Sequence, residues 1–509
     1  MVSVPPTFAS RWSDTVTAHP HALFLVWEAP DGEVTRWTYA EFDALVARVA
    51  GGLLARGVAP GDRVGIALRN SPAYVALWLA LVRVGAAMVC SDPSARTPEL
   101  AAHLRRTGAR LGFCAPERAD DYRAAARDTG TTVVEIAEDD THLSALLGRA
   151  APASTPPPGP YDLVGLMFTS GTTAEPKCVM VTQANYAFAG DVMAAAAELG
   201  PTDRQFVVLP MFHANAQYYS FASAIAVGAS VVLLPAFSAS RFVAQAARHE
   251  VTHVSLFAAP IRMILARTEA GDTAAELRVR HCWYAQNVTD EQYERFAALL
   301  GGCRPRQLYG MTETIPAVLT NPTVAPLPRS MGRPTPGCVV AVHDAATGAP
   351  ARAGEIVVGG EPGVSLFAGY LDDPAATAAA YRDGWFVTGD RARVDADGHF
   401  HFAGRRGDVL KVAGENVSIV EIEAVLAEHP AVLEAAVAGV PDDVRDEVPV
   451  AFVVAVPDAG PGALDDLADW CAARLAKAKR PARYELVAEL PRTSVGKIRK
   501  FLLTERTAP

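Results

Sequence analysis

A nine-residue segment, Thr169-Ser-Gly-Thr-Thr-Ala-Glu-Pro-Lys177, places hydroxyls, a glycine and one lysine between two apolar runs. The runs at 163–168 and 179–181 predict two strands joined by a polar loop. Backbone N–H groups, hydroxyls and a cation at a loop tip suit the oxygens of a polyphosphate. The candidate phosphate ligands are Thr169, Ser170, Gly171, Thr172, Thr173 and Lys177.

Two other interpretations of this segment were weighed against a phosphate-binding loop. A P-loop requires Gly-x4-Gly-Lys-Ser/Thr running into a helix, whereas Lys177 is followed here by Cys178 and a predicted strand. The segment is therefore not a P-loop. A plain surface hairpin remains the alternative when the segment is considered alone.

A second polar turn, Tyr309-Gly310-Met311-Thr312-Glu313, follows a short predicted strand. Loops at the carboxyl ends of strands are where α/β sheets bind ligands. Tyr309 can stack on a flat base, and Thr312 offers a hydroxyl to a phosphate. Glu313 supplies the hard oxygen ligand that Mg²⁺ prefers. By itself the segment is also compatible with an ordinary polar turn.

Weaker motifs lie nearer the C-terminus. Asp390, at the end of Trp-Phe-Val-Thr-Gly-Asp, could accept two hydrogen bonds from a ribose diol. Arg405 supplies a fixed charge in Gly-Arg-Arg-Gly-Asp, and Lys497 ends the polar segment Pro-Arg-Thr-Ser-Val-Gly-Lys. Each alone is equally typical of a Gly-Asp turn, a basic interdomain turn or a solvated tail.

The elements that must position these motifs alternate between helix and strand over residues 36–320. A proline-rich linker at 150–160 divides this region, and both parts predict a doubly wound α/β layer. From 332 to 402 the apolar period changes to two, which predicts a β-rich subdomain. We therefore expect an α/β protein with a large N-terminal domain, residues 1–403, and a small mobile α+β domain, residues 404–509.

Composition narrows the class of protein. Of 509 residues, 50% are apolar and 20% are charged, as in a folded enzyme of more than one domain. A net charge of −10 argues against a nucleic-acid partner. Seven cysteines without a C-x-x-C pair, no signal-peptide pattern and no apolar run of membrane-spanning length lead us to expect a cytoplasmic protein with no membrane partner.

Together these motifs, in this order and spacing, resemble the adenylate-forming superfamily of acyl-CoA synthetases, amino-acid adenylation domains and luciferases. The resemblance spans about residues 35–500. Within the superfamily, the segments 310–314, 414–418 and 444–447 are similar to those of the carnitine/crotonobetaine-type CoA ligases. The resemblance implies ATP and Mg²⁺ as ligands and coenzyme A as the probable co-substrate.

The same resemblance implies where ATP binds. The 169–177 loop would surround the β- and γ-phosphates, and the turn that contains Tyr309, Gly310 and Met311 would lie against adenine. Asp390 and Arg405 would hold the ribose hydroxyls.

Four residues would carry the chemistry. Thr312 would contact the α-phosphate, and Glu313 would bind the metal ion. Lys497 would bridge the attacking carboxylate and the α-phosphate in the first half-reaction. The family's C-terminal domain then rotates about a hinge, here Gly407, and Lys411 would face the site in the second conformation. Many members have Asp or Lys at this hinge, so Gly407 is a departure.

The acid pocket also departs from the family pattern. Where a Ser-Gly-Gly-Ala-type sequence is common, this chain has Cys-Trp-Tyr-Ala-Gln-Asn at 282–287. Large and polar side chains there predict a short polar or aromatic acid instead of a fatty acid. The expected lining is His213, Asn215, Gln217, Tyr284 and Gln286; His213 is equally compatible with an ordinary core histidine.

The leading hypothesis is ATP-dependent adenylation of a small acid, followed by transfer to coenzyme A. One alternative is a diazotase that activates nitrite as its adenylate for attack by an aminoaryl acid. Another is transfer to the thiol of a separate carrier protein. A nucleotide-binding pseudoenzyme is disfavoured, because Lys177, Glu313, Asp390, Arg405 and Lys497 are all present.

Overall fold

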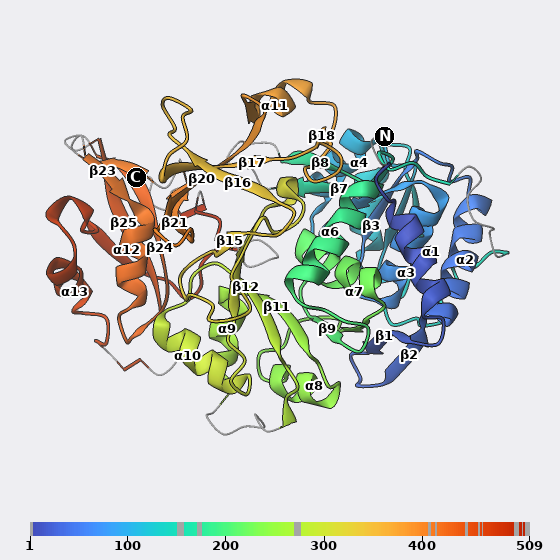
Figure 1. Ribbon diagram of the computed structural model, residues 1–509, viewed down its shortest axis with the longest axis horizontal. Helices are drawn as coiled ribbons and strands as arrows, with labels where there is room; N and C mark the ends of the chain where they lie inside the picture. Colours follow the sequence, from blue (N-terminus) through green and yellow to red (C-terminus); the bar gives the residue numbers. More distant parts are fainter. Residues whose placement is uncertain are drawn as a thin grey trace.

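The computed structural model consists of a large body of three sheets with their helices and a smaller C-terminal body around a fourth sheet (Figure 1). The α/β fold class is confirmed. The domain boundary expected after residue 403 stays a prediction. The structure describes residues 4–149, 157–169, 176–268, 276–405, 409–412, 415–442, 446–456, 459–460, 462–492, 498–500 and 502–503.

A seven-stranded sheet carries the predicted phosphate loop. Its order is β18-β8-β7-β4-β3-β5-β6. The strands β7, β4, β3, β5 and β6 are parallel to one another, and β8 pairs antiparallel with both β7 and β18. The strands are β3 (Arg63–Ala67), β4 (Ala87–Cys90), β5 (Leu111–Cys114), β6 (Thr132–Glu135), β7 (Leu163–Thr169), β8 (Lys177–Thr182) and β18 (Gly369–Tyr370).

A nine-stranded sheet, ordered β15-β14-β13-β12-β11-β9-β10-β1-β2, carries the turn after Tyr309. Its strands are β1 (Leu23–Glu28), β2 (Val34–Thr38), β9 (Arg204–Val207), β10 (Ser230–Leu233), β11 (His253–Phe257), β12 (His281–Ala285), β13 (Arg306–Tyr309), β14 (Leu319–Thr320) and β15 (Arg333–Pro334).

The strands are shared between the two sheets differently from the prediction. We expected one layer from each side of the 150–160 linker. Instead β7 and β8, which follow the linker, join the first sheet, and β1 and β2, which precede it, join the second. The reason is long-range pairing: the buried strand β1 pairs in parallel with β10, Leu25 opposite Val231.

Helices cover both sheets. They are α1 (Phe8–Ala18), α2 (Tyr39–Ala55), α3 (Pro72–Val84), α4 (Thr97–Thr107), α5 (Ala119–Ala126), α6 (Gln183–Ala196), the π-helix η2 (Asn215–Ala222), α7 (Ser223–Val227), α8 (Phe242–Arg248), α9 (Ala258–Leu265) and α10 (Asp290–Leu299). Every residue of α3 except Arg83 is buried. Ser71 followed by Pro72 in the sequence predicts a helix start, and Gly85 predicts the helix end. The structure confirms both, because Ser71 caps α3, Pro72 is its first residue and Gly85 ends it with φ +80°.

The period-two region forms the predicted β-rich subdomain. Its strands are β16 (Val339–His343), β17 (Ala353–Gly359), β19 (Tyr381–Arg382), β20 (Trp385–Val394) and β21 (Phe400–Arg405), with α11 (Pro374–Ala379) alongside.

The C-terminal body is α+β, as expected. It contains β22 (Val409–Val412), β23 (Glu415–Ser418), β24 (Val432–Asp442), β25 (Asp446–Ala455), β26 (Arg483–Leu486), α12 (Ile419–Ala427) and α13 (Leu467–Arg474).

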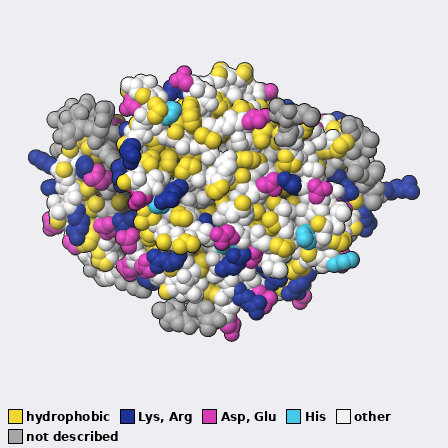
Figure 2. All heavy atoms as spheres, viewed as in Figure 1, with side chains coloured by type: hydrophobic (Ala, Val, Ile, Leu, Met, Phe, Trp, Pro, Cys, Tyr) yellow, Lys and Arg dark blue, Asp and Glu magenta, His cyan; other side chains and the backbone are white. Residues whose placement is uncertain are grey.

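On the face seen in Figure 2, side chains of Lys and Arg are interspersed with those of Asp and Glu. Within the described part of the chain, no helix combines the length and apolarity needed to cross a membrane.

Two buried histidines make folding sensitive to acid. His103 lies against Phe168 with ring centroids 3.7 Å apart, and His253 places Nε2 3.2 Å from the carbonyl of Ala197. Burial lowers the pKa of both rings from 6.5 to about 4. Between these values the unfolded chain binds protons that the folded chain does not, so stability falls as pH falls.

We predict that the free energy of unfolding drops between pH 7 and pH 5, by about 2 kcal/mol for each histidine. Urea unfolding at several pH values measures the slope. The His103→Asn variant should show a shallower slope than the native chain, whatever its absolute stability. An unchanged slope would contradict the assignment.

Candidate active site

The predicted phosphate loop lies at the tip of a hairpin. Strands β7 and β8 pair antiparallel in a register that sets Thr169 opposite Lys177, which confirms the strand–loop–strand prediction. The half-buried Lys177 is the first residue of β8. Ser170, Gly171, Thr172 and Thr173 lie outside the described residues.

Lys177 belongs to a cluster with Tyr370 and Glu313. Its Nζ lies 4.6 Å from the centroid of the Tyr370 ring, within range of a cation–π contact. The Tyr370 hydroxyl donates to Glu313 Oε1 at 3.1 Å. Burial, and then the charge of Glu313, raise the pKa of Tyr370, so the hydroxyl stays protonated and remains a donor.

Sequence reasoning missed Tyr370, because no motif near it was recognised. Strand β18 is two residues long, and it brings Tyr370 to Lys177 by pairing with Val179 of β8. The available signal was Gly369-Tyr370 ahead of Leu-Asp-Asp-Pro, a short run before a turn.

The turn after β13 is tightly constrained. A Cβ at Gly310 would approach Ala317 Cα to 2.8 Å and the Tyr219 hydroxyl to 3.1 Å, so only glycine fits. A 3₁₀ turn, η4, covers Thr312–Thr314, and the Met311 N–H donates to Thr314 Oγ1 at 3.0 Å. Glu313 is 3% exposed. The turn therefore fixes the backbone at Thr312 and Glu313.

Tyr309, Asp390 and Arg405 meet around one carboxylate. Strands β20 and β21 place Asp390 opposite Arg405, and Arg405 Nε donates to Asp390 Oδ1. The Tyr309 hydroxyl donates to Asp390 Oδ2 at 2.7 Å. Burial, and then the charge of Asp390, raise the pKa of Tyr309. Three residues predicted for the nucleoside from separate motifs are thus in contact with one another.

Three of the five predicted acid-binding residues, His213, Asn215 and Gln286, follow strands at one edge of the nine-stranded sheet, where the parallel strands β9, β11, β12 and β13 end. His213, partly exposed, follows β9 with its ring 4.2 Å from that of Phe212. Asn215 is buried at the start of η2 and donates to Ser255 Oγ at 3.0 Å. A π-helix at such an edge is typical of functional sites.

Gln286 is exposed just beyond β12 and has φ +71°, a strained backbone for a residue other than glycine. Its carbonyl accepts from Gln307 Nε2 at 3.0 Å. The same amide donates to Asn287 Oδ1 at 2.9 Å, so Gln307 holds the 286–287 turn in place.

The structure corrects the expected positions of Gln217 and Tyr284. Gln217 is fully buried. Its Oε1 accepts from the Tyr186 hydroxyl, and its Nε2 donates to the Met211 carbonyl at 2.5 Å, so its side chain connects core residues. Tyr284 packs on the face of the sheet that α8, α9 and α10 cover. Alternation along β12 leaves Trp283 on the opposite face, with η2 and α6.

Two predicted catalytic lysines are not placed. Lys497 lies outside the described residues. The backbone of Lys411 is in β22, opposite Asn416, but its side chain lies outside the described part.

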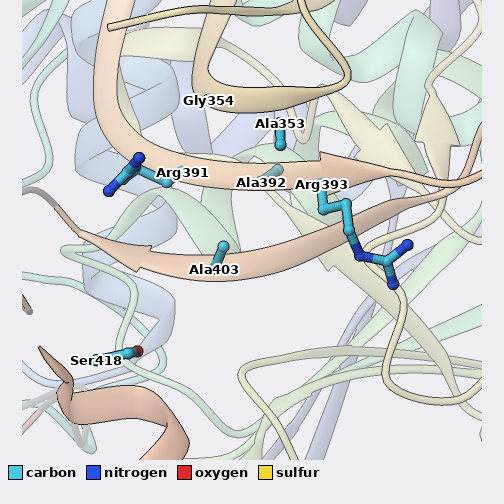
Figure 3. Close-up of a pocket in the computed structure, with 7 residues that line it drawn as sticks. All are labelled: Ala353, Gly354, Arg391, Ala392, Arg393, Ala403 and Ser418. Atoms are coloured by element: carbon cyan, nitrogen blue, oxygen red, sulfur yellow. The ribbon is translucent and has the colours of Figure 1, made fainter. Parts of the chain in front are cut away.

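A separate cavity of about 270 Å³ lies between the β-rich subdomain and Ser418 (Figure 3). Arg391 and Arg393 line it, but their guanidinium groups point away from each other in Figure 3. Among the predicted site residues that the structure describes, none lines this cavity.

Changing Tyr370 to Phe should separate the two contacts of this ring. Tyr370→Phe keeps the ring beside Lys177 but removes the donor to Glu313, so we predict a loss of about tenfold in kcat for ATP-dependent pyrophosphate release. Tyr370→Leu removes both contacts and should lose more. Equal activity of the Phe variant and the native chain would show that the hydrogen bond to Glu313 has no part in the reaction.

The chain is similar in sequence and fold to known proteins. The family models for the AMP-binding enzyme and its C-terminal domain match residues 12–371 and 421–497. The crotonobetaine/carnitine–CoA ligase of Salmonella arizonae is 31% identical over 504 residues, 96% of this chain and 97% of that protein. ATP-bound MatB from Rhodopseudomonas palustris, 27% identical, overlays with a TM-score of 0.87 over 99% of both chains, and apo MatB overlays with a TM-score of 0.77 over the same shares.

Proposed function

The chain belongs to the AMP-binding enzyme family and is an AMP-forming acid ligase, and from this premise we propose that it activates a small polar or aromatic acid and passes the acyl group to coenzyme A. The observation that carries the proposal is the contact of Lys177, Tyr370 and Glu313 beside the turn that begins at Tyr309.

We assign the two clusters to the two ends of ATP. Tyr309, Asp390 and Arg405 present a ring and a carboxylate suited to adenine and the ribose hydroxyls. Lys177 and the hairpin tip suit the outer phosphates. Thr312 lies between Tyr309 of the first cluster and Glu313 of the second. We therefore assign its hydroxyl to the α-phosphate.

Glu313 would hold Mg²⁺. Its buried carboxylate is a hard oxygen donor, and Tyr370 fixes the orientation of one oxygen. When bound, the ion would offset the negative charge of the phosphates.

In the proposed reaction an oxygen of the acid attacks the α-phosphorus, and the bond from that phosphorus to the pyrophosphate oxygen breaks. Pyrophosphate leaves and an acyl adenylate forms. We assign to Lys497 the bridge between carboxylate and α-phosphate, where its charge opposes the charge gathered in the transition state. The deprotonated thiol of coenzyme A then attacks the acyl carbon and AMP leaves, with Lys411 assigned to this second conformation.

Side chains on the inner face of β12 support a short acid. Trp283 is 2% exposed and packs among residues of α6 and η2. The guanidinium of Arg306 lies 4.4 Å from the centroid of the Trp283 ring, which fixes the indole. These bulky groups occupy the inner face of β12, so we assign His213, Asn215 and Gln286, at the strand ends, to a short polar or aromatic acid.

A pyrophosphate-release panel tests the proposal. The arms are crotonobetaine, benzoate, anthranilate, decanoate, and nitrite with 3-aminobenzoate, each with ATP and Mg²⁺, with and without coenzyme A. We expect pyrophosphate release with a small acid and formation of its CoA thioester. The rate with decanoate should be lower by about a hundredfold, because several of its methylenes would not be buried in a short pocket.

Other outcomes distinguish the alternatives. Equal rates with decanoate would refute the small pocket. Release that consumes nitrite and the arylamine, but no coenzyme A, would replace the ligase with a diazotase. Adenylate formation without thiolysis by coenzyme A would favour a carrier-protein thiol.

A further inference from the structure

Arg262, on α9, connects the large body to the C-terminal body. Its Nη2 donates to the carbonyl of Asn287 at 2.8 Å. Its Nη1 lies 3.7 Å from Oε1 of Glu434, on β24. One guanidinium therefore contacts the turn at the candidate acid site and a carboxylate of the other body.

Glu434 also reaches the segment that leads to Lys497. Arg492 Nη2 donates to Glu434 Oε2. Arg492 forms a β-bridge with Ile498, so the two residues close the base of the loop that contains Lys497. Arg262 and Arg492 thus share Glu434, one from each body.

Burial gives this contact more weight than an ordinary surface ion pair. The side chains of Arg262 and Glu434 are 20% and 15% exposed. Burial lowers the pKa of Arg262, and the charge of Glu434 opposes that shift. Removing one partner of a buried pair leaves the other charge uncompensated, which is costly.

A second pair between the bodies offers a matched control. Arg329 lies 3.7 Å from Glu428, and both side chains are nearly half exposed. Exposed pairs of this kind contribute little. Both pairs border the same groove of about 590 Å³ between α9 and α10 on one side and α12 and β24 on the other.

We propose that Arg262 is a positioning residue for adenylation, which couples docking of the C-terminal body through Glu434 to the Gln286–Asn287 turn at the acid site. This inference rests on the proposed function. Gln307 holds the 286–287 turn from the sheet side and Arg262 holds it from the groove side. Rotation of the C-terminal body for thiolysis separates Glu434 from Arg262, so the contact acts in the first half-reaction only.

The first test measures coupling without an acid substrate. Hydrogen–deuterium exchange of the full chain with MgATP is compared among the native protein, Arg262→Gln and Arg329→Gln. We expect Arg262→Gln to increase exchange in both 286–289 and 432–436, and Arg329→Gln to leave both unchanged. Increased exchange in only one of the two segments, or throughout the chain, would overturn the coupling.

The second test separates the half-reactions. Pyrophosphate release is measured with benzoate and crotonobetaine, and thiolysis with preformed benzoyl adenylate and coenzyme A. Arg262→Gln and Glu434→Gln should each lower kcat for pyrophosphate release by about tenfold to about a hundredfold, with thiolysis within about twofold of native. The double variant should be no slower than the worse single variant, because both remove one interaction.

Three results distinguish the outcomes. Equal loss in both half-reactions, or additive losses in the double variant, would overturn the positioning role. Arg262→Lys, which keeps the charge but not the fork of donors, should recover part of the rate. If the native protein releases pyrophosphate with no acid, the proposed function fails, whereas the exchange experiment still decides whether Arg262 couples the two segments.

Discussion

The candidate site depends on one tyrosine, Tyr370, that contacts a lysine through its ring and a buried carboxylate through its hydroxyl. Glu313 and Lys177 come from different sheets, and Tyr370 contacts both. This contact requires β18 to pair with β8 and the turn after β13 to be tight enough for Glu313 to be buried. Lys177, at the start of β8, and the turn after Tyr309 are thereby brought together from the two sheets.

The candidate site is also connected to the C-terminal body. The nucleoside cluster ends at Arg405, in the last strand of the β-rich subdomain, and the chain then enters the C-terminal body. Arg262 lies behind the acid-side turn and faces the same body. The candidate site thus adjoins both bodies, through the chain that leaves Arg405 and through the contact of Arg262 with Glu434.

Local patterns predicted what local chemistry determines. The cap at Ser71, the stop at Gly85 and the hairpin around Lys177 depend on neighbouring residues, and all three are present. Partners distant in sequence were not predictable in this way. The pairing of β1 with β10 and the contact of Tyr370 with Glu313 join segments with no shared pattern. The sequence pattern predicts a strand from Val279 to Tyr284, whereas β12 spans His281–Ala285. The face on which Tyr284 lies depends on the pairing of β12 with its neighbours, which the pattern does not determine.

In the proposed reaction, an oxygen of the substrate attacks the α-phosphorus of ATP. The most direct measurement uses the acid that supports pyrophosphate release, labelled with ¹⁸O in its carboxylate, and follows the label by mass spectrometry of the nucleotide product. The account predicts one ¹⁸O atom in the phosphate of AMP after a complete turnover with coenzyme A. Unlabelled nucleotide, with the ¹⁸O in inorganic phosphate, would contradict it, because activation would then have occurred at the terminal phosphate.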